Sequence, residues 1–135
     1  MSIKTVFIGP DGTEHTDPKI EWLLDLIGNA GDSYWASGSG DAGLRFFSDE
    51  KPVGEMILVI RQSNGAFVQH LFNVDGLEYV LNDPALGQDE VTVKVGGNPW
   101  SLPRALFVSR SIASLAVQRF LQDGHRFESG NWLKF

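Results

Sequence analysis

The sequence predicts an α+β fold: a single antiparallel β-sheet with an N-terminal and a C-terminal helix packed on it. The first observation is a series of short strand-like segments separated by turn signals, among them the hairpin sequence Asn64-Gly65. The second is helical periodicity in two places, one near each end of the chain. The third is the length of 135 residues, which fits one domain over residues 1–135.

The first strand and the first helix are expected near the N-terminus. Residues 4–8 alternate as in a strand, and the turn signal at residues 9–12 follows. Asp17 before Pro18 is typical of a helix N-cap and the first helical position. Residues 28–31 are rich in glycine and end the helix. Its apolar stripe consists of Ile20, Leu23, Leu24 and Ile27.

The middle of the chain is expected to form β-strands. The Gly-rich segment 38–43, Asn64-Gly65 and residues 82–84 supply the turns. Residues 96–100, with Trp100 close to two prolines, are expected to be a loop. The expected strands are residues 33–37, 44–48, 56–62, 67–72, 77–81 and 90–95.

The C-terminal segment is expected to contain a short strand over residues 105–109 and a helix over residues 110–122. Ser109 is the expected N-cap of the helix, and Gly124 is the expected left-handed residue that ends it. A last strand around Trp132 closes the predicted sheet.

The composition, 42% hydrophobic and 21% charged, is that of an ordinary globular protein. The absence of cysteine excludes disulfides, thiol nucleophiles and cysteine-based metal sites. The N-terminal residues do not resemble a signal peptide, and no run of roughly 20 apolar residues could span a bilayer. We therefore expect a cytoplasmic protein that does not bind membranes.

Charge is distributed unevenly along the chain, whose net charge is −6. Residues 1–90 contain fifteen acidic and five basic residues, whereas residues 91–135 contain two acidic and six basic residues. An acidic face would repel nucleic acid and attract a basic protein, so no nucleic-acid partner is expected. The alternative interpretation is that acidic loops only keep the protein soluble.

The polar residues do not form a known catalytic, cofactor-binding or metal-binding motif. Residues 38–43 match G-x-G-x-x-G, but strand-like residues follow where a nucleotide-binding loop would open a helix. His15, His70 and His125 lack the spacing of metal ligands, and His70 is expected to pack or to form a hydrogen bond inside the protein. We therefore expect no catalytic residue, no cofactor and no metal.

Exposed carboxylates and aromatic side chains are the candidate residues for binding a partner. Tyr34 and Trp35 are adjacent on an expected strand, so one of the two is expected on each face of the sheet. The candidate partner-binding residues are Asp32, Tyr34, Trp35, Asp41, Asp83, Asp89 and Glu90.

A particular order of residues marks the C-terminal part of the chain. Val108-Ser109 precedes the helix, Phe120-Leu121 and then Gly124 end it, and Trp132 follows near the C-terminus. Residues 40–46 add a hairpin of the form G-D-x-G-L-x-F. This order resembles the first-numbered Imm family of bacterial immunity proteins, which accompany polymorphic toxins, deaminase toxins among them.

The resemblance implies an immunity protein, not an enzyme, that protects the producing cell by binding a cognate toxin domain. It implies a 1:1 complex in which the toxin's active site, expected to be basic, is occluded. Members of the family do not share fixed functional residues, so none is transferred to this chain. Residues 125–128 depart from the family, in which a proline is common at this place.

Two alternatives remain open from the residues alone. A small hydrolase or transferase could assemble a site from scattered residues such as His70, Asp75 and Glu78, provided that the fold brings them to a pocket. An adaptor or oligomerising module could instead use an edge of the sheet to bind a partner.

Overall fold

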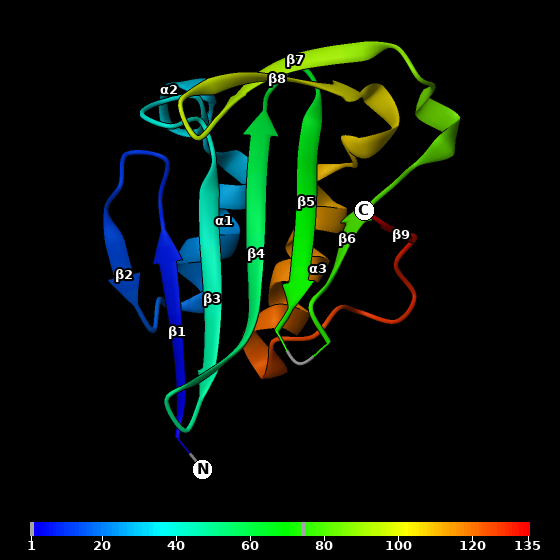
Figure 1. Cartoon of the computed structure of the whole chain (residues 1–135). Coiled ribbons are helices and arrows are strands. Elements are labelled where there is room, and N and C mark those ends of the chain that lie inside the picture. Colours follow the sequence, from blue (N-terminus) through cyan, green and yellow to red (C-terminus); the bar gives the residue numbers. More distant parts are fainter. Residues whose placement is uncertain (1, 74) are drawn as a thin grey trace.

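The computed structural model describes residues 2–73 and 75–135, and its main element is a seven-stranded antiparallel sheet (Figure 1). The strand order is β2-β1-β3-β4-β5-β6-β9, and β7 and β8 form a separate two-stranded sheet, the β7–β8 ribbon. The strands are β1 Ile3–Ile8, β2 Glu14–Thr16, β3 Ala42–Ser48, β4 Lys51–Arg61, β5 Gly65–Phe72, β6 Leu77–Leu81, β7 Glu90–Val95, β8 Asn98–Pro103 and β9 Trp132–Lys134. The helices are α1 Ile20–Asn29, α2 Asp32–Trp35 and α3 Arg110–Asp123, with short 3-10 turns η1 Pro84–Leu86 and η2 Arg104–Leu106.

One face of the sheet packs against α1 and α3, which lie behind it in Figure 1. Leu23 and Ile27 of α1 and Val117 and Phe120 of α3 are fully buried in this core. Burying each such side chain contributes about 1.5–3 kcal/mol. The α+β class with an antiparallel sheet is therefore confirmed.

The opposite face of the sheet is covered in part by the β7–β8 ribbon. Val93 and Val95 of β7 pack with Val59 and Phe67 of the sheet in a second buried cluster. Neighbouring residues of β4 therefore pack in different buried clusters, one on each face of the sheet, because side chains alternate between the two faces of a strand. The ribbon crosses the end of the sheet at which β4 ends and β5 begins (Figure 1).

Several predicted local features are confirmed. Asn64-Gly65 lies at the turn between β4 and β5. The Ser109 side chain accepts a hydrogen bond from the Ile112 N–H at the start of α3. Gly124 ends α3 with φ of 78°, a left-handed conformation that glycine adopts without steric cost.

The expected start of α1 is wrong by two residues. Asp17 is not the N-cap, since Lys19 occupies that position and its side chain caps nothing. The carboxylate of Asp17 instead accepts a hydrogen bond from the Thr5 N–H at 2.9 Å and binds the edge of β1. The short strand β2, which the sequence analysis missed, lies between β1 and α1.

The strand expected over residues 33–37 is also wrong, because Asp32–Trp35 form the short helix α2. Tertiary contacts override the β-propensity of the aromatic pair here. The Trp35 indole Nε1–H donates to the Leu26 carbonyl at 3.1 Å, and Arg61 binds the Trp35 carbonyl.

The expected loop at residues 96–100 is shorter than predicted, because β8 begins at Asn98 and Trp100 pairs with Val93. A two-stranded ribbon tolerates the prolines at both ends of β8, because an edge strand can lack a donor. The strand expected over residues 105–109 is reduced to η2 and a single bridge between Ala66 and Val108. Within the described residues, no helix is long and apolar enough to cross a membrane.

Candidate functional site

Arg61, the last residue of β4, links the elements that carry the first group of candidate residues. Its guanidinium donates to the carbonyls of Trp35, Gly40 and Lys94 at 3.0–3.3 Å, and also to its own neighbour Ile60. Burial lowers the pKa of Arg61, and the carboxylates of Asp32 and Asp41 act in the opposite direction. Arg61 remains charged, since guanidinium does not lose its proton in proteins.

Asp32 and Asp41 both act electrostatically on this arginine. The Asp32 carboxylate accepts the Gln62 N–H at 2.8 Å. The Asp41 carboxylate accepts the Gly96 N–H at 2.8 Å and so fixes the tip of the β7–β8 ribbon. Both carboxylates remain partly exposed at this end of the sheet.

The two aromatic candidates have different positions. Trp35 is 1% exposed and belongs to the core between the sheet and the helices. The proposal of Trp35 as a partner-binding residue is therefore corrected, because a buried side chain offers no area to a partner. Tyr34 is half-buried with its ring edge against Trp35, at a centroid distance of 5.1 Å.

The second group of carboxylates lies at the other end of the β7–β8 ribbon. Asp83 accepts the Ala85 N–H at 3.1 Å and caps η1. The main-chain carbonyl of Asp89 accepts a hydrogen bond from the Arg104 N–H. Asp89 and its neighbour Glu90 are both exposed. We call the two groups together the acidic band: Asp32, Asp41, Asp83, Asp89 and Glu90.

The acidic band is not neutralised by ion pairs. The described residues contain two ion pairs, Arg45–Glu55 and Arg119–Asp123, and neither involves the band. Each carboxylate of the band therefore lacks a Lys, Arg or His nitrogen within 4.0 Å in the part of the chain that the structure describes. Exposed carboxylates without ion-pair partners attract positively charged molecules.

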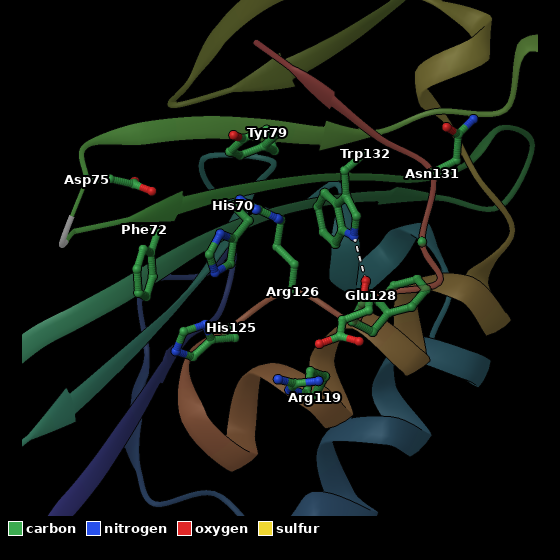
Figure 2. Close-up of a pocket in the computed structure, with 12 residues that line it drawn as sticks. His70, Phe72, Asp75, Tyr79, Arg119, His125, Arg126, Glu128, Asn131 and Trp132 are labelled. Carbon is green, nitrogen blue, oxygen red and sulfur yellow. Dashed lines mark hydrogen bonds between the residues drawn. The ribbon is translucent and has the colours of Figure 1, made fainter.

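A pocket of about 590 Å³ lies elsewhere, between the sheet and the segment that follows α3 (Figure 2). We call it the C-terminal pocket. Most of its lining residues are aromatic or carry a charge of either sign, and a glycine and an asparagine complete it: His70, Phe72, Asp75, Tyr79, Arg119, His125, Arg126, Phe127, Glu128, Gly130, Asn131 and Trp132.

The hydrolase site considered from the sequence is not assembled. His70 and Asp75 do line the C-terminal pocket. Glu78, however, is cross-strand to Leu71 on the other face of the sheet, where it accepts a hydrogen bond from Gln69 Nε2 at 3.2 Å. Neighbouring residues of β6 point to opposite faces, so Tyr79 enters the pocket and Glu78 does not.

His70 is buried beside the pocket and has a defined tautomer. Its Nε2 lies 2.8 Å from the Gly124 carbonyl, which only accepts hydrogen bonds, so Nε2 carries the proton. Its Nδ1 is buried and has no hydrogen-bond partner among the described residues. Burial lowers the pKa of His70 below its ordinary value of 6.5; the bond to Gly124 opposes this shift, and Arg126 and His125 add to it.

The lowered pKa of His70 predicts a loss of stability in mild acid. Below pH 6.5 the unfolded chain binds a proton at this histidine that the folded protein resists, so the free energy of unfolding falls as the pH falls. The slope from this one group is at most about 1.4 kcal/mol per pH unit, the value for one proton. We expect the free energy of urea unfolding to fall more steeply between pH 7 and pH 5 in the wild type than in His70→Phe. An equal pH dependence in both proteins would contradict it.

Charged and aromatic side chains form the rest of the pocket wall. The Arg126 guanidinium stacks over the Tyr79 ring, 3.7 Å from its centroid. Arg119 is paired with Asp123 at 3.1 Å. The Trp132 Nε1–H donates to the Phe127 carbonyl at 3.1 Å, which fixes the indole against the loop (Figure 2).

Sequence reasoning missed both Arg61 and the C-terminal pocket. The signal for Arg61 was present, since a single charge ends the apolar run Met56–Ile60. The pocket carried no such signal, because its residues come from separate parts of the chain. No group of three His, Asp or Glu side chains in residues 2–73 and 75–135 could hold a metal ion. No protein-family model matches the chain, and no curated protein matches it.

Proposed function

We propose that the protein is an immunity protein that binds a cognate bacterial toxin domain in a 1:1 complex and occludes its active site. The observation that carries the proposal is the acidic band, whose carboxylates lack ion-pair partners among the described residues. The residue order at the C-terminus, which resembles the first-numbered Imm family, supports it. In this proposal α3 corresponds to the C-terminal helix of that family.

The mechanism follows from electrostatics and not from catalysis by this chain. A toxin domain that acts on a nucleic acid or a nucleotide needs a basic surface for its substrate, and the acidic band would bind that surface. The complex would form in the cytoplasm of the producing cell. An interface of this kind buries roughly 1,600 Å² in total.

Charge reversal within the band tests this mechanism. We expect Asp89→Lys/Glu90→Lys to slow association with the toxin domain by roughly tenfold at low salt and to flatten its salt dependence. Both side chains are exposed, so the fold should be retained. Stopped-flow fluorescence at several salt concentrations measures the rate.

Glu21→Lys/Asp25→Lys on α1 is the matched control, because it makes the same change in net charge at exposed positions outside the band. The control should retain most of the association rate. Equal slowing by the two double variants would mean that net charge alone steers binding, and an unchanged rate in both would place the interface elsewhere. Either result would contradict the role of the band.

A further inference from the structure

We propose that the C-terminal pocket binds a planar aromatic group that carries a hydrogen-bond donor, as phenol and indole do. The inference goes beyond the proposed function, since none of the acidic-band residues lines this pocket. Three features carry it: an unused buried acceptor, aromatic walls and a nearly balanced charge.

The acceptor is His70 Nδ1. The other ring nitrogen, Nε2, is committed to the Gly124 carbonyl, so Nδ1 presents a lone pair and not a proton. His70 is 1% exposed, and no described residue donates to Nδ1. Buried polar atoms are normally satisfied. Because Nδ1 has almost no accessible surface, a ligand that donates an N–H or O–H to it would displace a neighbouring side chain of the pocket wall and complete the site.

The walls are suited to a flat ring. The His70 ring lies between Phe72 and Trp132, with centroid distances of 6.4 Å and 6.2 Å (Figure 2). The indole N–H of Trp132 is already used by the Phe127 carbonyl, so this residue offers mainly its apolar surface. Aromatic rings pack favourably against such surfaces in stacked or edge-on arrangements.

Arg126 adds a second planar surface. Its guanidinium lies 3.7 Å over the Tyr79 ring, and no carboxylate of the described residues is within 4.0 Å of it. A guanidinium held flat in this way can stack on a further ring through a cation–π contact.

The charge of the lining argues for a neutral ligand. Arg126 and Arg119 are opposed by Asp75 and Glu128, and Arg119 is further neutralised by Asp123 at 3.1 Å. A strongly anionic ligand such as a phosphate ester would meet these carboxylates. A neutral ring with one donor would leave the balance unchanged.

The same chemistry has two possible sources, a free small molecule or a Tyr or Trp side chain of a protein partner. Phenol and toluene form the first pair of probes, because they share size and shape and differ in the hydroxyl donor. We expect phenol to bind about fivefold more tightly than toluene, the effect of one hydrogen bond. Binding is measured on the full chain by NMR shifts of Trp132 and Tyr79.

His70→Phe should remove the preference for phenol, whereas His15→Phe on β2 should retain it, since His15 does not line this pocket. If His70→Phe fails to fold, an NMR titration of the wild-type protein still tests the proposal. Phenol donating to Nδ1 should lower the pKa of His70 in an NMR titration, and toluene should not.

N-acetyl-tyrosinamide, which carries the phenol on a main chain, distinguishes the two sources. Its binding at the same residues points to a partner's side chain, and its exclusion while phenol binds points to a free small molecule. Equal affinity for phenol and toluene, or shifts confined to other parts of the surface, would overturn the proposal. None of these measurements uses a toxin, so they can fail without affecting the proposed function.

Discussion

Trp35→Ala is expected to lower the free energy of unfolding by about 3–5 kcal/mol, as truncations of large buried aromatic residues do. The indole is 1% exposed and packs in the core between the sheet and the helices. The change also removes the donor to the Leu26 carbonyl, which lies 3.1 Å from Nε1. Urea unfolding followed by circular dichroism measures the loss.

Trp100→Ala is the matched control. Trp100 is 37% exposed on β8, so its truncation should cost no more than about 1.5 kcal/mol. Equal losses in the two variants would mean that Trp35 does not have the core role assigned to it. A stable Trp35→Ala protein that had lost only toxin binding would restore Trp35 as an interface residue.

Arg61→Met is expected to cost about 2–4 kcal/mol, because several buried carbonyl groups lose their donor at once. The arginine is 8% exposed and joins α2, the turn at Gly40 and the β7–β8 ribbon. Loss of the bridge should also loosen the ribbon tip. Faster hydrogen exchange at the Gly96 amide, which is bonded to Asp41, would report that local opening.

Arg45→Met on the neighbouring strand β3 controls for the loss of a positive charge. Arg45 lies 3.8 Å from Glu55, and the two side chains are 51% and 44% exposed, so the pair is expected to contribute less than about 1 kcal/mol. Similar losses in the two variants would contradict the bridging role of Arg61.

Local sequence signals predicted the parts of the fold that depend on local chemistry. The turn at Asn64-Gly65 needs a positive φ, and Gly65 has φ of 99°. The two ends of α3 depend on a hydroxyl at Ser109 and a left-handed Gly124, which the sequence indicates directly.

The errors arose where distant residues decide the structure. Residues 33–37 have strand-like composition, but α2 forms because the Trp35 side chain is bound to Leu26 and its carbonyl to Arg61. The C-terminal pocket depends on a contact between His70 and Gly124, which are 54 residues apart. Periodicity and turn signals describe neighbours along the chain and hold no information on such pairs.

Burial separates the candidate partner-binding residues, because Trp35 is buried and the other six are partly or fully exposed. Charge and loop position singled out the carboxylates of the acidic band as candidates, and their binding role stays a prediction. The structure places them near the two ends of the β7–β8 ribbon. Aromatic character alone did not separate Trp35, which is buried, from Trp100, which is 37% exposed. Burial of an aromatic side chain depends on packing across the whole fold.

The most direct test of the central claim is co-expression of this chain with the polypeptide encoded next to its gene. We predict that the C-terminal domain of that polypeptide kills cells when expressed alone. We also predict that this chain restores growth and co-purifies with the domain as a stable 1:1 complex. Restored growth without a complex would contradict occlusion of the active site, and the absence of both toxicity and binding would contradict the immunity function itself.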